Sequence, residues 1–146
     1  MAKIEILIGT TLGGSEYVAD ELAAILTEAG HECSTYLEPS LEKLDKRALW
    51  LLVSSTHGAG DLPDNLQPFA KEVQLSMPDL QGVRFALCAI GDSSYDTFCE
   101  GPEGLVDLLT DGGAQAFVDK IRIDVQQDPV PEEAAALWLQ SWIDQI

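Results

Sequence analysis

Short apolar runs alternate with longer amphipathic stretches along nearly the whole chain. Three runs, at residues 4–8, 48–54 and 83–90, are rich in Val, Ile, Leu and other apolar residues. Runs of this length and composition are typical of strands buried on both faces, as in parallel sheets. The mixed segments 33–37 and 116–123 predict two further strands. We therefore predict five strands.

Between these strands, apolar residues recur at the spacing of one helix face. Gly30 is expected to end the first helix, and Gly112 with Gly113 the third. Asp64 and Asn65 are expected to cap the second, with Pro68 in its first turn. The four predicted helices carry the following apolar positions: Val18, Leu22, Ile25, Leu26 and Ala29; Leu66, Phe69 and Val73; Leu105, Leu108 and Leu109; and, after Pro131, Ala135, Trp138, Leu139, Trp142, Ile143 and Ile146.

Strands that alternate with helices predict a doubly wound α/β sandwich. A chain of 146 residues with 46% hydrophobic residues can build one full core, so we expect a single domain, 1–146. No apolar run is long enough to span a bilayer, and no signal-peptide core follows the first Met. We expect a cytoplasmic protein with no membrane partner.

The charge balance is strongly acidic, with 25 Asp and Glu against 8 Lys and Arg and a formal net charge of −17. Such a chain repels the phosphate backbone of nucleic acids, so nucleic acid binding is excluded as a function class. One explanation of this charge is a solvated surface that keeps the protein soluble and binds no partner. An acidic docking face for a basic partner is the sharper hypothesis, because several acidic residues crowd two loops: Asp61, Asp64, Asp92, Asp96 and Glu100.

The chain has three cysteines, at positions 33, 88 and 99, and no CxxC pair. This odd number and spacing indicate free thiols in a reducing compartment, with neither a disulfide nor a metal site. Cys88 falls in an apolar run and is expected in the core. Cys99 lies next to a glycine- and serine-rich loop and could approach a ligand.

Three predicted strands run directly into loops rich in Gly, Ser and Thr. The loops read GTTLGGS at 9–15, SSTHGAGD at 54–61 and GDSSYDTFC at 91–99. Ligands bind at the carboxyl ends of the strands in open parallel sheets. We therefore predict one composite pocket, with a phosphate site in the first loop and a planar ring near Tyr95.

Three common nucleotide-binding or signalling motifs are absent from these loops. A Walker A loop requires GxxxxGK[ST], and the first loop has no Lys. The dinucleotide motif GxGxxG is also missing. A receiver domain would place acidic residues at the ends of the first and third strands, where this chain has Gly9, Thr10, Ser54 and Ser55. The sequence thus fits none of these three classes.

A phosphate in the first loop would have to be held by neutral groups. No Lys or Arg lies between Ile4 and Glu42, so hydroxyl and backbone N–H groups are the available donors. A helix that begins in this loop adds a dipole that favours an anion. An ordinary glycine-containing turn between strand and helix remains an alternative. The candidate donors and close-approach glycines are Thr10, Thr11, Ser15, Gly13 and Gly14.

With these loops in view, the chain resembles the flavodoxin family. The first loop is similar to the family's phosphate loop, (S/T)-x-T-G-x-(S/T), although Leu12-Gly13-Gly14-Ser15 replaces the commoner polar residue, Gly and small residue before Thr. STHGAGDLPDN at 55–65 and the loop at 91–99 resemble the second and third flavin loops. The resemblance implies a flavodoxin-like three-layer sandwich, with a five-stranded parallel sheet and helices on both faces. It also implies FMN as the cofactor and electron carriage, without a substrate of its own, as the activity.

Carried over residue by residue, the resemblance implies an FMN site. Tyr95 would stack on the exposed face of the isoalloxazine ring, and His57 stands where relatives carry Trp or Tyr. The peptide 58–59 would lie beside flavin N5, and Asp92 and Ser93 near the polar edge of the ring. The full set of implied FMN contacts is Thr10, Thr11, Leu12, Gly13, Gly14, Ser15, Ser55, Thr56, His57, Gly58, Ala59, Gly60, Gly91, Asp92, Ser93, Tyr95, Phe98 and Cys99.

His57 and Pro102 stand at positions where this chain differs from what is usual in the family. A protonated His57 beside the flavin would raise the reduction potential, whereas a solvent-facing His57 would leave it unchanged. Pro102 follows the third loop and is expected in the first turn of a helix.

The resemblance also implies redox partners. It suggests a flavodoxin reductase as electron source and a reductively activated enzyme as acceptor, and stand-alone short relatives are linked to biotin synthase. A carboxylate about 6 Å from a developing flavin anion opposes it by roughly 3 kcal/mol, or on the order of 100 mV. We therefore expect a low-potential donor, acting as a monomer. A small FMN-dependent quinone or azo reductase that uses NAD(P)H, and an interaction module without flavin, are the alternatives.

Overall fold

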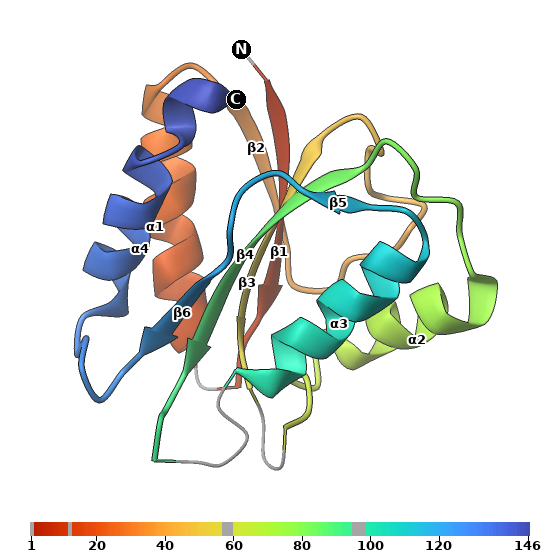
Figure 1. Ribbon diagram of the computed structural model, residues 1–146. Helices are drawn as coiled ribbons and strands as arrows, with labels where there is room; N and C mark the ends of the chain where they lie inside the picture. Colours follow the sequence, from red (N-terminus) through yellow and green to blue (C-terminus); the bar gives the residue numbers. More distant parts are fainter. Residues whose placement is uncertain (1, 12, 57–59, 95–98) are drawn as a thin grey trace.

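A parallel sheet runs through the middle of the protein in the computed structural model, which describes residues 2–11, 13–56, 60–94 and 99–146 (Figure 1). Its strand order is β2-β1-β3-β4-β5, and β6 also pairs with β4. All pairings are parallel, which confirms the predicted fold class. The strands are β1 (Lys3–Gly9), β2 (Glu32–Tyr36), β3 (Leu49–Ser55), β4 (Arg84–Gly91), β5 (Gln115–Ala116) and β6 (Ile121–Asp124).

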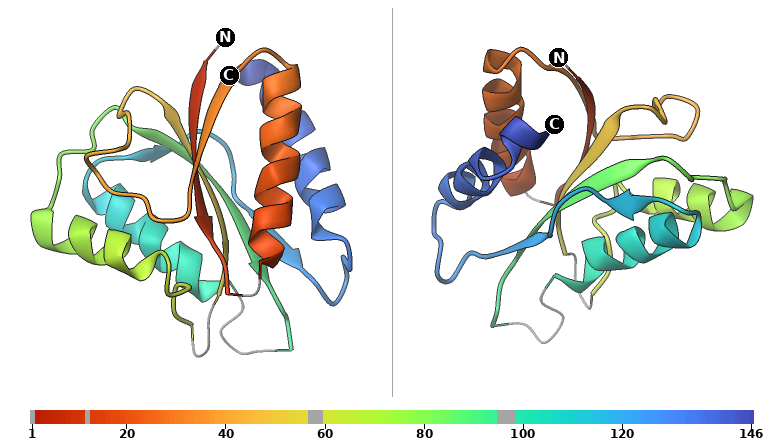
Figure 2. Two further views of the ribbon diagram at one scale, coloured as in Figure 1. Left: turned by 180° about the vertical axis from the view of Figure 1, so that it is seen from behind. Right: turned by 45° about the horizontal axis from the view of Figure 1, so that its top comes forward.

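Helices cover both faces of the sheet. The helices α1 (Gly14–Glu28) and α4 (Pro131–Gln140) pack side by side on one face. The helices α2 (Gln67–Ser76) and α3 (Glu100–Asp111) pack on the other (Figures 1 and 2). Pro68 lies in the first turn of α2, as predicted. The chain termini lie together at the end of the molecule opposite the carboxyl ends of the strands.

The alternation of side chains along β3 explains why its sequence is apolar throughout. Trp50 and Leu52 face the core under α2 and α3, whereas Leu51 and Val53 face the core under α1 and α4. All four side chains are fully buried. The prediction that β3 is a strand buried on both faces is therefore confirmed.

The predicted fifth strand at 116–123 is divided in two. The short β5 pairs with the start of β4, and β6 pairs with its end, residues 88–91. Between them, Phe117 packs edge-on against Trp142, with ring centroids 6.0 Å apart, and the Trp138 indole N–H donates to the Asp119 carbonyl at 3.1 Å. These contacts with the last helical segment draw the chain away from a continuous strand.

The last helix is shorter than its apolar stripe suggests. It ends at Gln140, and the chain continues through Trp142 into a 3₁₀ turn, η1 (Ile143–Gln145). Trp142 is nonetheless buried in the core beneath α1 and α4. The apolar spacing correctly marked core residues, but the prediction of one continuous helix to Ile146 is wrong.

The carboxyl group of Glu5 is buried against the sheet. Glu5 in β1 is fully buried, and its Oε2 accepts hydrogen bonds from the Tyr36 hydroxyl at 3.0 Å and the Asp45 amide at 3.2 Å. Its Oε1 has no hydrogen-bond partner within the described residues. Desolvation, and secondly the Glu5 carboxyl, raises the pKa of Tyr36. Glu5 thus ties β1 to the end of β2 and to the loop that precedes β3.

Candidate functional site

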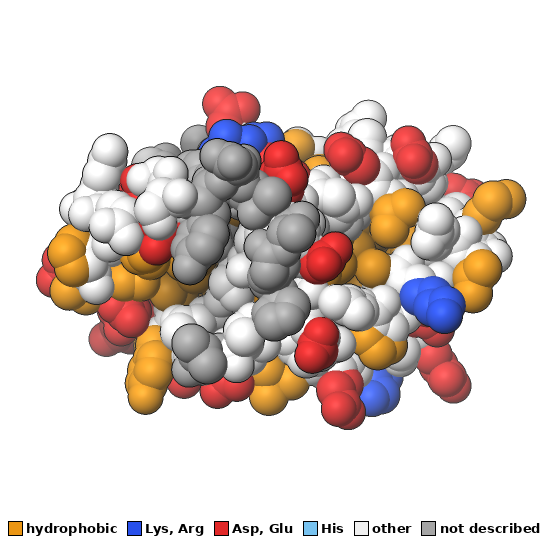
Figure 3. Space-filling model, turned by 90° about the horizontal axis from the view of Figure 1, so that it is seen from below, with side chains coloured by type: hydrophobic (Ala, Val, Ile, Leu, Met, Phe, Trp, Pro, Cys, Tyr) orange, Lys and Arg blue, Asp and Glu red, His pale blue; other side chains and the backbone are white. Residues whose placement is uncertain are grey.

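The candidate site lies at the carboxyl edge of the sheet, where three loops begin side by side. The pairing register sets Gly9 of β1 beside Ser54 of β3, and Ser55 beside Ile90 of β4. Figure 3 views this end of the molecule, where acidic side chains lie on several sides and Lys or Arg side chains are few. The edge therefore combines polar loops with a negative surrounding surface.

The predicted contact residues divide into two groups. Six of them lie outside the described residues: Leu12, His57, Gly58, Ala59, Tyr95 and Phe98. The described ones are Thr10, Thr11, Gly13, Gly14, Ser15, Ser55, Thr56, Gly60, Gly91, Asp92, Ser93 and Cys99. These twelve predicted contact residues lie at or just beyond the ends of β1, β3 and β4, or at the start of a helix that follows.

The first loop is shaped by Thr10 and Gly13. The Thr10 Oγ1 accepts a hydrogen bond from the Gly13 amide at 2.7 Å. Gly13 has a φ of 87°, a left-handed conformation that favours glycine, and it immediately precedes α1. A Cβ added at Gly13 or Gly14 would meet no atom within 4 Å, so the space above these residues is open among the described atoms. Thr11 is exposed at the tip of this loop.

Ser15 places its hydroxyl in the first turn of α1. The residue is 3% exposed, and its Oγ has no hydrogen-bond partner among the residues that the structure describes. A buried hydroxyl without a partner is costly, because it has lost its hydrogen bonds to water. The N–H groups of a first helical turn also lack partners within the helix and attract anions. Ser15 and the amides around it are therefore suited to an anionic ligand such as a phosphate.

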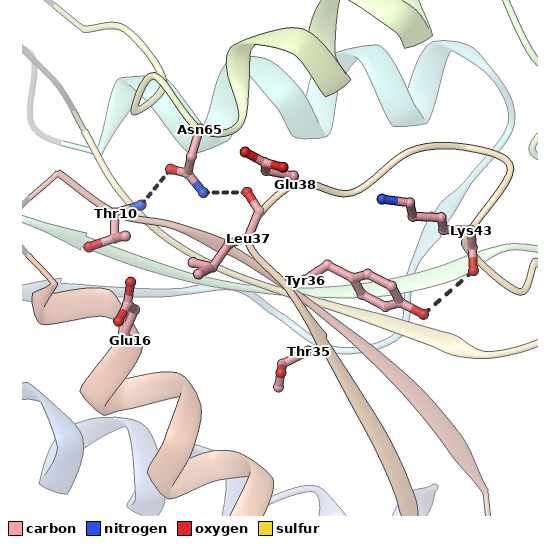
Figure 4. A pocket seen from close by; sticks show the side chains of 8 residues that line it. All are labelled: Thr10, Glu16, Thr35, Tyr36, Leu37, Glu38, Lys43 and Asn65. Atoms are coloured by element: carbon pink, nitrogen blue, oxygen red, sulfur yellow. Dashed lines mark hydrogen bonds between the residues drawn. The ribbon is translucent and has the colours of Figure 1, made fainter.

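Asn65 has a role that the sequence did not reveal. The prediction that Asp64 and Asn65 cap α2 is wrong, because the residue at the cap is Leu66 and no described side chain makes a capping hydrogen bond. The Asn65 amide oxygen accepts from the Thr10 amide at 3.0 Å, and its Nδ2 donates to the carbonyls of Ile8 at 2.6 Å and Leu37 at 2.7 Å. Asn65 thus joins the first loop to the ends of β1 and β2 (Figure 4).

A hollow of about 540 Å³ adjoins the first loop on the β2 side. Thr10 and Asn65 form one part of its wall, and Tyr36, Glu38 and Lys43 form another (Figure 4). Carboxylate and ammonium groups both line this hollow, so its charge does not select for an anion. The anion site indicated by the buried Ser15 hydroxyl is the better candidate.

The second loop and the start of α3 pack directly against each other. The Gly101 amide donates to the Thr56 Oγ1 at 3.2 Å. A Cβ added at Gly101 would overlap the Asp61 carbonyl oxygen, so only a glycine allows this approach. Cys99, just before α3, is fully buried with a φ of 60°. The ends of the second and third loops are thereby fixed to each other.

The third loop begins with a network of hydrogen bonds around two carboxylates. The Ser94 amide and hydroxyl donate to the Asp92 Oδ1 at 2.9 and 2.6 Å, and these bonds are the main reason that the pKa of Asp92 is lowered. The Ser93 amide donates to the Asp124 Oδ1 at 3.1 Å, and hydrogen bonding to Ser93 likewise lowers the pKa of Asp124. Both groups therefore carry negative charge at neutral pH. Sequence reasoning missed Asp124, which follows no recognisable motif.

Two cations near the third loop are paired with one carboxylate. Arg122 donates to both oxygens of Glu103 at 2.7 and 2.6 Å, and the Lys120 ammonium lies 2.7 Å from the Glu103 Oε2. The hydrogen bonds from Arg122 are the main cause of the lowered pKa of Glu103. This cluster offsets part of the positive charge beside the candidate site.

The cysteine predictions agree with the burial of the thiols. All three are free, and Cys88 is buried in the core as predicted. Burial raises the pKa of Cys99 to about 11, so this thiol is protonated at neutral pH. Within the described residues, no three His, Cys, Asp or Glu side chains gather so that they could hold a metal ion. Among the helices of the described part of the chain, none is both long and apolar enough to cross a membrane.

Comparison with known proteins gives consistent matches over nearly the full chain. A family model described as Flavodoxin matches residues 6–138. The chain is 45% identical over 144 residues to Protein MioC of Escherichia coli (strain K12), covering 99% of this chain and 98% of the relative. It is 37% identical over 146 residues to Flavodoxin YqcA of the same strain, covering 97% of each chain.

Comparison with solved structures also identifies flavodoxins. A cysteine-to-serine mutant of a flavodoxin from Pseudomonas aeruginosa superposes with a TM-score of 0.87 at 34% identity, covering 96% of this chain and 95% of that one. A Fusobacterium nucleatum flavodoxin bound to flavin mononucleotide superposes with a TM-score of 0.79, covering 100% and 99% of the two chains. At 15% identity, this second likeness concerns the fold alone.

The close approach of Gly101 to the Asp61 carbonyl yields a stability prediction with a matched control in the same helix. Gly101→Ala should lower the free energy of unfolding by about 2 kcal/mol, because the added methyl group overlaps backbone atoms. Gly104→Ala should leave it unchanged or raise it by about 0.5–1 kcal/mol, because its surroundings are open and alanine favours helices. Urea unfolding of both variants measures the difference, and equal changes in the two variants would contradict it.

Proposed function

The chain belongs to the flavodoxin family, and from this premise we propose that it binds FMN at the carboxyl edge of the sheet and carries single electrons between other proteins. The observation that carries the proposal is the buried Ser15 hydroxyl in the first turn of α1, which finds no hydrogen-bond partner in the described part of the chain. The family supplies a cofactor whose phosphate would complete this hydrogen bond. The chain would then act as a carrier and not as an enzyme with its own substrate.

The first loop fits a phosphate group without a cation. Gly13 and Gly14 leave space for close approach, and the Thr10 hydroxyl, which already accepts from Gly13, still has its own proton to donate. Asn65 fixes the Thr10 amide and so limits the shapes that the loop can take. We propose that Ser15, Thr10, Thr11 and the amides around them hold the phosphate.

The flavin ring would lie between the second and third loops. Thr56 and Gly101 hold the ends of these loops together on one side of that space. Asp92 and Ser93 would meet the polar edge of the ring. The stacking role of Tyr95 and the position of His57 remain predictions from the family resemblance, together with the peptide 58–59.

Bound FMN would supply reversible one-electron chemistry, and the residues of the chain would set how readily it takes charge. A phosphate held by neutral donors keeps its negative charge in the site. Asp92 and Asp124 add further negative charge, since their lowered pKa values keep them ionised at neutral pH. Negative charges disfavour a reduced, anionic flavin, so we propose that the protein is a low-potential electron donor.

We propose that redox partners dock on the acidic face around the loops. The overall charge of −17 and the acidic side chains on the loop end of the molecule support a basic partner surface (Figure 3). A flavodoxin reductase would supply electrons, and a reductively activated enzyme, for example biotin synthase, would accept them. We propose that the protein works in the cytoplasm as a monomer.

The docking hypothesis predicts a marked effect of salt. The rate of electron transfer from a flavodoxin reductase should fall as NaCl is raised from 0.05 to about 0.5 M, because the Debye length shrinks to a few ångströms. Stopped-flow absorbance of the flavin measures this rate. A rate that does not change with ionic strength would contradict docking through the acidic face.

The phosphate role of Ser15 can be separated from the ring contacts. Ser15→Ala should weaken FMN binding by about tenfold, because one hydrogen bond to a charged group is lost. Riboflavin lacks the phosphate, so its affinity should be unchanged. Quenching of flavin fluorescence gives both dissociation constants, and Ser76→Ala on α2 is the control. Equal weakening of FMN and riboflavin binding would contradict the assignment.

One-electron carriage predicts three spectra during stepwise reduction. When the FMN-loaded protein is titrated with a chemical reductant, absorbance should show a stable spectrum between the fully oxidised and fully reduced ones. A direct change between two spectra would count against carriage of single electrons. Rapid reduction by NAD(P)H without any reductase would instead favour the quinone or azo reductase alternative.

A further inference from the structure

The last residue of β6 and the start of the turn after it, together residues 124–126, lie against the start of the third loop. Gly91 at the end of β4 pairs in register with Asp124 at the end of β6. The Val125 amide extends this pairing by donating to the Gly91 carbonyl at 2.9 Å. The ends of β4 and β6 therefore lie side by side where the chain leaves the sheet.

Asp124 connects the loop to this turn through one carboxylate oxygen. Its Oδ1 accepts from the Ser93 amide at 3.1 Å and from the Gln126 amide at 3.0 Å. Asp124 is only 9% exposed, so its side chain has little freedom to take another position. The third loop is thus held by a residue that lies more than 30 positions further along the sequence.

Gln126 provides a second connection to the same loop. Its Nε2 donates to the Asp92 Oδ2 at 3.0 Å. The other oxygen of Asp92 is occupied by the Ser94 amide and hydroxyl. The carboxylates of Asp92 and Asp124 therefore each have donors that offset the repulsion between them. The segment 124–126 holds both Asp92 and Ser93 in place.

We propose that Asp124 and Gln126 are positioning residues for flavin binding, which hold Asp92 and Ser93 where these two residues meet the ring. The inference rests on the proposed function, because it concerns the same site. A loop that is held in its bound shape before the ligand arrives loses less conformational entropy on binding, and its affinity is correspondingly higher. Neither Asp124 nor Gln126 needs to touch the flavin for this effect.

The test combines a measurement on the protein without FMN with a binding measurement. Asp124→Ala should increase the hydrogen exchange rate of the Ser93 amide and weaken FMN binding, each by about tenfold. Riboflavin binding should weaken equally, because the affected residues meet the ring and not the phosphate. Asp124→Asn keeps an acceptor oxygen for the Ser93 amide and should show clearly smaller changes in both measurements.

Two further variants complete the design. Gln126→Ala removes the exposed second connection and should give a change in the same direction as Asp124→Ala. It carries the test if Asp124→Ala does not fold. Asp107→Asn, on the exposed side of α3, removes one negative charge elsewhere and should leave Ser93 exchange and flavin binding unchanged.

The outcomes separate this inference from the proposed function. If the wild-type protein binds FMN and Asp124→Ala behaves like Asp107→Asn, the positioning role is overturned while the proposed function stands. Equal losses in Asp124→Ala and Asp124→Asn would also overturn it, because charge and not the acceptor position would then be responsible. A wild-type protein that binds neither flavin would refute the proposed function itself.

Discussion

The central constraint on this structure is a parallel sheet that is covered by helices on both faces. Such a sheet has no free face on which to build a site, because side chains such as Trp50 and Leu51 are buried on opposite sides of the same strand. Polar groups can gather only where the strands end. The register of β1, β3 and β4 brings their carboxyl ends together, so the three loops become neighbours although they are far apart in the sequence. Everything proposed about function depends on this shared edge.

The sequence was sufficient for the parts of the structure that follow from local pattern. Buried strands, amphipathic helices and the start of α2 near Pro68 could be predicted, and the family resemblance and fold class are confirmed. The division of the fifth strand could not, because it depends on contacts of Phe117 and Asp119 with tryptophans of the last helical segment. Asn65 had the sequence signature of a helix cap, but its amide found three partners in other segments. The individual flavin contacts stay predictions.

The negative charge of the site depends on which hydrogen-bond donors the chain places there. The first loop offers hydroxyl and amide groups, and the cations Lys120 and Arg122 near the third loop are paired with Glu103. At the third loop, Asp92 and Asp124 keep their charges because N–H and O–H groups stabilise them. A bound anionic cofactor would therefore meet polar groups that hold it without neutralising it. We propose that this arrangement would make the reduced cofactor a strong reductant, because negative charge is kept beside it.

The contact between Gly101 and the Asp61 carbonyl has a consequence for protein engineering. Because the start of α3 lies directly on the backbone of the second loop, neither segment has room to change its path independently. A chimaera that takes its third loop from a relative would need a second loop that matches it, including the glycine at the point of approach. The second and third loops are best treated as a single exchangeable module, and that module must keep Asn65, which fixes the Thr10 amide of the first loop.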